Sequence, residues 1–107
     1  MAEVKDRAMK VLMRHINKIK KKFNPERIIL FGSRARKDNL VNSDIDLIIV
    51  SKKFEGIPWR RRIIDAFGDW DDKIMLEPIC YTPDEFEEKK KQVGLVKQAV
   101  KEGVVLV

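Results

Sequence analysis

The sequence predicts an α/β fold, a small mixed β-sheet with flanking helices. Two apolar runs, residues 28–31 and 47–50, have the length of buried strands and are rich in isoleucine. Residues 3–22 instead repeat apolar side chains at helical spacing. Strand and helix patterns alternate again further along the chain. We therefore expect the order α, β, short α, β, α, β, α, α, short β, with the helices packed on the sheet.

The length and composition predict one domain, residues 1–107, with a core that buries roughly 65% of the unfolded surface. The N-terminus is too charged for a signal peptide, and no apolar run exceeds four residues, so we expect neither secretion nor a membrane span. Cys80 is the only cysteine, which excludes an intramolecular disulfide and a paired-cysteine metal site. These features predict a cytoplasmic protein.

The first predicted helix covers Glu3–Lys22, and Asn24–Pro25 ends it. His15, the only histidine, borders its apolar stripe; no second ligand stands at a suitable spacing, so we expect a packed or half-exposed residue. Arg27–Phe31 follows as the first strand. The apolar stripe of the helix consists of Val4, Ala8, Val11, Leu12, Ile16, Ile19 and Phe23.

The connection between the first two strands, Gly32–Ser43, is too long for a tight hairpin. We expect it to hold a short helix near residues 34–38. Ile45–Val50 is the second predicted strand, and Lys52–Gly56 is a predicted loop. Pro58 then opens a helix, in the first turn, where proline is tolerated.

The helix after Pro58 carries both tryptophans near its apolar stripe, and we expect both in the core rather than on a base-stacking surface. Its basic residues, 60–62, fall on the other side and are expected either to face solvent or to contact a polyanion. The stripe consists of Trp59, Ile63, Ala66, Phe67 and Trp70.

Lys73–Tyr81 is the third predicted strand, and Pro78 within it favours an edge position or a bulge. Thr82 and Glu85 have the spacing of a capping box, which predicts a helix start. That helix is expected to continue through residues 89–91. A further helix over 93–102 stops at a glycine, and residues 104–107 form a short strand.

Two carboxylates stand at the start of the second strand. Residues two apart on a strand point to the same face, so Asp44 and Asp46 are expected side by side next to the core. Like charges this close repel each other, and a divalent cation would relieve the repulsion. The alternative is a solvated acidic turn. A calcium-binding EF-hand loop over residues 38–49 is excluded, because Ser43 and Ile49 occupy the positions that need Gly and Glu.

Gly32 and Ser33 follow the first strand directly. Backbone N–H groups after Gly32 would form an anion site at the start of a short helix, and glycine lets a phosphate approach closely. Ser33 adds a hydroxyl, and Arg34 or Arg36 adds positive charge. An ordinary turn is the alternative explanation of the Gly-Ser pair taken alone.

Together, Gly32-Ser33, ten intervening residues and Asp44-Ile45-Asp46 resemble the signature of the nucleotidyltransferase superfamily related to polymerase beta. The segments FGSRAR and SDIDL are most similar to its smallest branch, the minimal nucleotidyltransferases. The resemblance covers nearly the whole chain and implies the nucleotidyltransferase fold. It also implies a third carboxylate on the next strand, where Glu77 stands in place of the more frequent Asp. Lys37 replaces a glycine that the family often has.

The resemblance implies a mechanism in which Asp44, Asp46 and Glu77 hold two Mg²⁺ ions. ATP or another NTP would bind with its terminal phosphates on the Gly32-Ser33 turn. A hydroxyl would attack the α-phosphate, and Glu77 would be a metal ligand or a general base, with an edge-strand charge facing water as the alternative. Minimal nucleotidyltransferases commonly pair with a helical HEPN-type toxin, so AMP transfer to such a partner, with this chain as antitoxin, is the expectation.

Two other functions remain open at this stage. One is a binding module that keeps the fold and acts by docking to its partner. The other is a nucleic-acid binder, because the net charge of +6 favours polyanions, although the same lysines and arginines also suit solvated helix faces. The base preference, the acceptor and the oligomeric state, including a homo-oligomer, are left open by the sequence.

Overall fold

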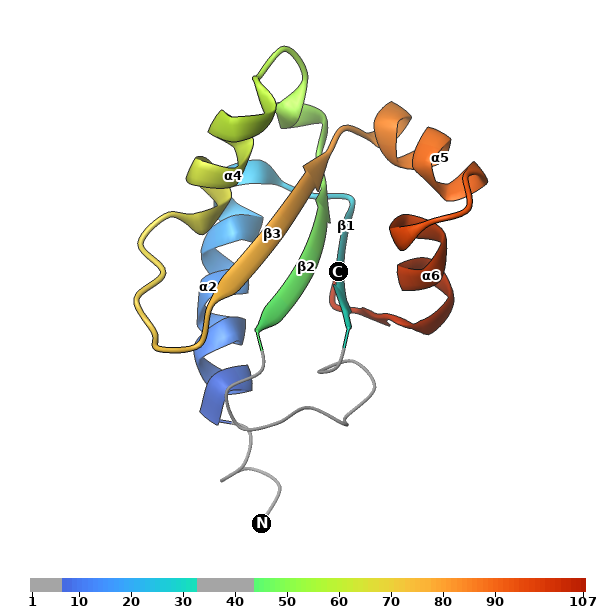
Figure 1. Cartoon of the computed structure of the whole chain (residues 1–107). Coiled ribbons are helices and arrows are strands. Elements are labelled where there is room, and N and C mark those ends of the chain that lie inside the picture. The colour runs from blue at the N-terminus through green and yellow to red at the C-terminus, as the bar shows by residue number, and fades with distance from the viewer. Residues whose placement is uncertain (1–6, 33–43) are drawn as a thin grey trace.

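The computed structural model describes residues 7–32 and 44–107, and its centre is a four-stranded sheet in the order β3-β2-β1-β4 (Figure 1). β1 runs antiparallel to β2 and β4, whereas β2 and β3 are parallel. This mixed sheet with its flanking helices confirms the predicted α/β fold class. The strands are β1 (Arg27–Phe31), β2 (Ile45–Val50), β3 (Leu76–Tyr81) and β4 (Val104–Val105).

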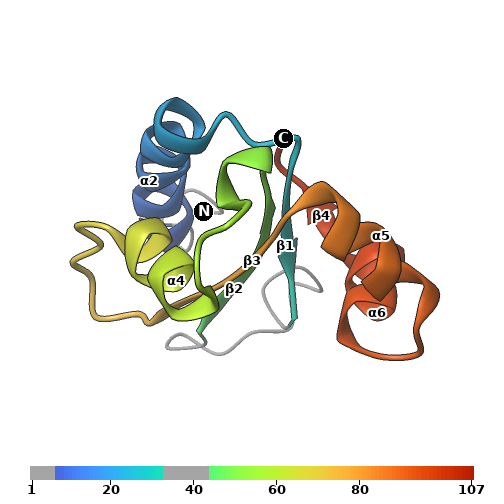
Figure 2. The same ribbon diagram turned by 90° about the horizontal axis from the view of Figure 1, so that it is seen from above.

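Helices cover both faces of the sheet, α2 and α4 on one side and α5 and α6 on the other (Figure 2). They are α2 (Arg7–Phe23), α4 (Trp59–Phe67), α5 (Pro83–Lys91) and α6 (Leu95–Glu102), and a short 3₁₀ helix, η1, covers Lys52–Phe54. Among residues 7–32 and 44–107, no helix has the length and apolar character needed to cross a membrane.

The alternation of side chains along β2 divides the core into two clusters. Leu47 and Ile49 pack with α2 and α4, while Ile48 and Val50 face α5 and α6. All four side chains are almost fully buried. Both faces of β2 are therefore apolar beyond its first residues, which explains the continuous apolar run in the sequence.

The first helix buries the predicted stripe from Ala8 to Phe23, although Val11 is only half buried, and Val4 lies outside the described residues. His15 is buried as well. Its Nε2 donates to the carbonyl oxygen of Ala66 at 2.9 Å, and its ring meets Trp70 edge-on at 5.4 Å. This confirms His15 as a packed helix residue.

The interpretation of α4 was wrong at two residues. Trp59 is 44% exposed rather than in the core, because the helix begins at the rim of the sheet and the indole lies against the Tyr81 ring. Arg62 is buried instead of facing solvent or a polyanion. Trp70 is buried as expected, but the helix ends before it, at Phe67.

Arg62 is buried because the ends of three elements meet around its guanidinium. Nε donates to the Ile57 carbonyl oxygen at 2.8 Å, and Nη1 donates to the Cys80 carbonyl oxygen at 3.3 Å and to Glu85 Oε1 at 2.6 Å. Glu85 in turn completes the predicted capping box with Thr82. Arg62 thus joins α4, the end of β3 and the start of α5.

Several predicted bounds need correction. β3 begins at Leu76 rather than Lys73, because residues 68–75 form turns and bends around the buried Trp70. α6 begins at Leu95 instead of Val93, since Gly94 interrupts the helix with a φ of +156°. η1 occupies most of the predicted 52–56 loop. β3 is an edge strand, as Pro78 indicated, while the predicted helix near 34–38 lies outside the described residues.

We predict that Glu85→Gln lowers the free energy of unfolding by about 1 kcal/mol at pH 7, because a hydrogen bond to a charged group contributes roughly 1.5–3 kcal/mol and the Glu85 side chain is 43% exposed. Hydrogen bonding with Arg62 lowers the pKa of the Glu85 carboxyl. The stabilisation is therefore complete above the ordinary carboxyl pKa of about 4.3 and is lost as the pH falls through the lowered pKa. Urea unfolding between pH 3 and 7 measures this.

Glu88→Gln is the matched control, because Glu88 pairs with Lys91 at 3.7 Å on the exposed side of the same helix. Such a pair contributes little. Equal stabilities of the two variants at pH 7 would contradict a structural role for the Arg62–Glu85 pair.

Candidate active site

The register of the sheet brings Phe31, Asp46 and Glu77 into one row. Phe31 of β1 pairs with Asp46 of β2, and Asp46 pairs with Glu77 of β3 in parallel register. Paired residues in a sheet share a face, so the two carboxylates lie side by side. Asp44 stands one residue before β2 rather than on it, and it is exposed. The predicted neighbourhood of all three carboxylates therefore exists at one end of the sheet.

The three carboxylates interact strongly. Glu77 is exposed, yet hydrogen bonding with Asp44, desolvation and the charges of Asp46 and Asp44 raise the pKa of its carboxyl. Burial also raises the pKa of Asp46, and the charge of Asp44 adds to this, while a hydrogen bond from Glu77 acts in the opposite direction. The ionised forms of these side chains therefore disfavour one another, most clearly at Glu77. Such perturbed groups at the end of a strand are typical of functional sites.

Gly32 makes the close approach of β1 to Asp46 possible. Its φ is +78°, and a Cβ placed on it would lie 2.7 Å from Asp46 Oδ2. A side chain at this position would collide with the carboxylate, and the backbone conformation itself favours glycine. Gly32 is thus favoured both by its backbone conformation and by its contact with Asp46. An ordinary turn, the alternative explanation of the Gly-Ser pair, does not account for this contact.

The donor set has the chemistry of a site for a hard divalent cation, because carboxylate oxygens are the preferred ligands of Mg²⁺. In the part of the chain that the structure describes, however, no group of three or more His, Cys, Asp or Glu side chains is arranged so that it could hold a metal ion. The cluster thus fits Mg²⁺ in donor type and charge but is not a preformed coordination shell.

The remaining predicted site residues, Ser33, Arg34 and Arg36, lie outside the described residues, as does Lys37. Their roles in phosphate binding stay predictions.

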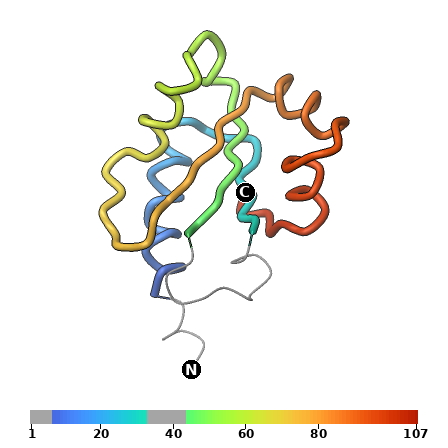
Figure 3. Tube along the Cα trace, in the orientation of Figure 1, coloured from blue at the N-terminus to red at the C-terminus, as the bar shows by residue number. Residues whose placement is uncertain are grey.

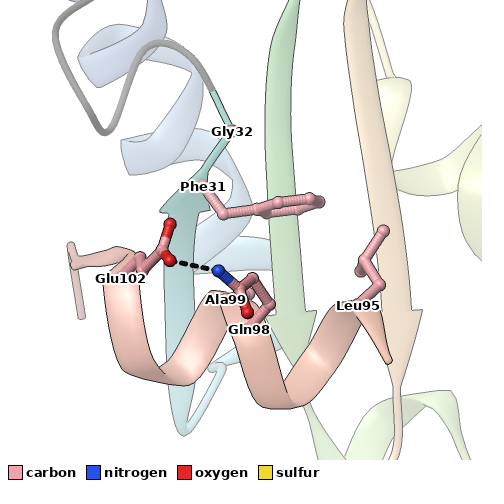
Figure 4. A pocket seen from close by; sticks show the side chains of 6 residues that line it. All are labelled: Phe31, Gly32, Leu95, Gln98, Ala99 and Glu102. Atoms are coloured by element: carbon pink, nitrogen blue, oxygen red, sulfur yellow. Dashed lines mark hydrogen bonds between the residues drawn. The ribbon is translucent and has the colours of Figure 1, made fainter. Parts of the chain in front are cut away.

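A pocket beside the carboxylates was missed by the sequence analysis. It has a volume of about 210 Å³ and lies between the end of β1 and α6 (Figure 4). We call it the α6 pocket. The helical period of 95–102 predicted an amphipathic helix, but no signal in the sequence placed its polar residues next to Gly32. The lining residues are Phe31, Gly32, Leu95, Gln98, Ala99 and Glu102.

Fold and site together define a small α/β domain with carboxylates clustered at the start of β2. Residues 12–106 match the model of the nucleotidyltransferase domain family. The match spans most of the chain, so the protein belongs to this family, and membership supports a general activity in nucleotidyl transfer.

The structure also resembles a crystal structure of a protein from Sulfolobus solfataricus assigned as a nucleotidyltransferase. The two share 24% identity with a TM-score of 0.69, over 97% of this chain and 83% of that one. BolA1 from Arabidopsis thaliana is similar over 70% of this chain and 94% of its own, with 21% identity and a TM-score of 0.52. Both likenesses concern the fold. No curated protein matches the sequence.

We predict that Gly32→Ala destabilises the protein more than Gly56→Ala does. Both glycines have a positive φ, which should cost about 1–2 kcal/mol on substitution. Only Gly32 adds a collision with Asp46, since a Cβ on Gly56 has no atom within 4 Å. The excess destabilisation should disappear when Gly32→Ala is combined with Asp46→Ala. Denaturant unfolding of Gly32→Ala, Gly56→Ala, Asp46→Ala and the double variant tests this. If Gly32→Ala remains more destabilising than Gly56→Ala in the absence of the Asp46 side chain, the contact is refuted.

We further predict that Glu77→Gln raises the melting temperature at pH 7 in the absence of metal. The pKa of Glu77 is raised in the folded state, so its ionisation disfavours folding as the pH rises through that pKa. Below the pKa of the unfolded chain, about 4.3, wild type and variant should converge. Glu26→Gln, an exposed glutamate beside β1, is the control. A lower melting temperature of Glu77→Gln at pH 7 would contradict the carboxylate repulsion.

Proposed function

We propose that this protein is a Mg²⁺-dependent nucleotidyltransferase that moves AMP from ATP to a hydroxyl acceptor. The observation that carries the proposal is the parallel register that sets Glu77 beside Asp46 and Asp44. Three neighbouring acidic groups are unfavourable for an isolated domain, and a positively charged ligand would relieve their repulsion. We further propose that residues 1–107 act as one catalytic domain in the cytoplasm.

In the proposed function, Asp44, Asp46 and Glu77 would hold the metal, as two ions. When bound, Mg²⁺ neutralises phosphate charge and lowers the pKa of a coordinated hydroxyl. The Gly32-Ser33 turn, with Arg34 or Arg36, would hold the terminal phosphates. The acceptor oxygen forms a bond to the α-phosphorus as the bond to the pyrophosphate oxygen breaks.

Glu77 has the best placement for the proton that the acceptor hydroxyl loses. Its carboxylate lies beside Asp46 and Asp44, and hydrogen bonding with Asp44, together with desolvation and the charge of Asp46, raises its pKa in the metal-free domain. It also lies on the edge strand, where an acceptor can approach. Asp46 is enclosed between β1 and β3 and is therefore better suited to hold a metal ion.

We propose that the acceptor is a hydroxyl, with tyrosine first, on a helical HEPN-type partner, so that the pair forms a toxin–antitoxin system. The alternative is a docking module without transfer. Exposed apolar side chains near α6 and β4 favour a protein partner in either case, since Val93 is 95% exposed and Val105 56%.

We predict that Asp46→Asn weakens Mg²⁺–ATP binding by more than about tenfold, the scale for loss of a group that supports a metal site. Glu77→Gln should keep the affinity within a few-fold but lose most transfer of AMP, because the group acts on the acceptor in the transition state. Calorimetry measures the first effect, and transfer of label from the α-phosphate of ATP measures the second. Glu26→Gln serves as the surface control in both assays.

Equal ATP binding by wild type and Asp46→Asn would remove the metal role of Asp46. Undiminished transfer by Glu77→Gln would remove the proposed base. If wild type binds a co-encoded helical partner tightly but labels neither that partner nor RNA, the docking module is the correct function.

A further inference from the structure

The α6 pocket and the carboxylate site meet at Gly32. Gly32 lines the pocket, and the position of its absent Cβ is 2.7 Å from Asp46 Oδ2. A ligand in the pocket therefore sits beside the carboxylates. Pockets that enclose a whole drug-sized ligand usually span about 300–1,000 Å³. At about 210 Å³, this pocket suits one ring system of a larger ligand whose remainder lies outside it.

The walls of the pocket suit a flat aromatic ring. Figure 4 shows Phe31 extending from β1 across α6, with Leu95 near the start of the helix. Phe31 is half buried and Leu95 is 49% exposed, so both keep apolar surface for a ligand. Ala99 adds little bulk between them. Stacking of a base on such a surface contributes to binding of any nucleobase and does not select among them.

Selectivity can come from Gln98. Its Nε2 donates a hydrogen bond to Glu102 Oε2, one helical turn away. An ionised carboxylate can only accept hydrogen bonds, so Glu102 fixes which end of the Gln98 amide it contacts. The carbonyl oxygen of Gln98 is left as the acceptor at the pocket. The polar edge of the pocket thus offers acceptors, the Gln98 oxygen and the Glu102 carboxylate.

We propose that the α6 pocket binds the base of the nucleotide and that Gln98, oriented by Glu102, selects bases with an amino group at C6 of a purine or C4 of a pyrimidine, adenine first. This inference rests on the proposed function. Adenine and cytosine present an amino donor at the edge where guanine and uracil present a keto acceptor. Gln98 Oε1 accepts from that amino group, whereas a keto oxygen at the same place is repelled by Oε1, because the NH₂ side of the amide is turned toward Glu102. Adenine buries more ring surface against Phe31 than cytosine does.

The test compares the binding of ATP, CTP, GTP and UTP to the full chain, each with Mg²⁺ and without an acceptor. ATP should bind about threefold to tenfold more tightly than GTP, the range for one hydrogen bond, and CTP should exceed UTP in the same way. Gln98→Met keeps the length of the side chain but removes the acceptor, so ATP should lose this advantage. Glu102→Gln lets the Gln98 amide turn over, and the ATP-to-GTP ratio should fall while GTP affinity rises.

Val100→Ala is the matched control, because Val100 is exposed on α6 and does not line the pocket. It should keep the wild-type ratio. If all four nucleotides bind wild type equally, or if Gln98→Met keeps the preference for ATP, the base-pocket inference is wrong while the proposed function stands. If none of the four binds, the proposed function fails and this inference fails with it.

Discussion

The parallel pairing of β2 with β3 is the constraint on which the site depends. β2 is the strand that contacts both β1 and β3, and its side chains from Leu47 to Val50 are buried on both faces. Charged groups can stand only at its start. Because β3 runs in the same direction, its own start lies beside that of β2, and Glu77 arrives next to Asp46. An antiparallel β3 would have placed Glu77 at the opposite end of the sheet.

The register that aligns these carboxylates is fixed far from them. Arg62 binds the carbonyl oxygen of Cys80 and the carboxylate of Glu85 at the end of β3, and the capping box starts α5 immediately afterwards. A slip of one residue would turn Glu77 to the other face and place Pro78 beside Asp46. The buried arginine and the helix cap therefore act on the site through the strand, although neither touches it.

Sequence reasoning found what local patterns encode. The strands β1 and β2, the cap at Thr82 and the edge position of Pro78 follow from apolar runs, hydrogen-bonding capacity and the missing proline N–H. Local patterns did not predict the contacts between segments that are distant in the sequence. The burial of Arg62 depends on carbonyl oxygens from other elements, and the exposure of Trp59 depends on where α4 meets the sheet.

The same limit applies to the candidate site. The spacing of Gly32 and Asp46 pointed to a shared function, but only the fold shows why glycine is favoured at position 32, since its φ is +78° and the Asp46 carboxylate occupies the place of a Cβ. The α6 pocket escaped detection because Phe31 and Gln98 are separated by most of the chain and meet only when β4 returns to β1. Local sequence patterns do not reveal contacts between residues this far apart in the chain.

The charge distribution gives the proposed function its selectivity for a metal-bound substrate. The chain carries a net charge of +6, which attracts a triphosphate at long range. At the start of β2, however, three clustered carboxylates repel phosphate at short range. A free nucleotide would therefore be attracted to the protein but repelled near Asp46. A nucleotide accompanied by a divalent cation would keep the long-range attraction, and its cation would offset the short-range repulsion. Within the proposed function, the repulsion that contributes to the raised pKa of Glu77 would favour binding of the nucleotide together with a cation.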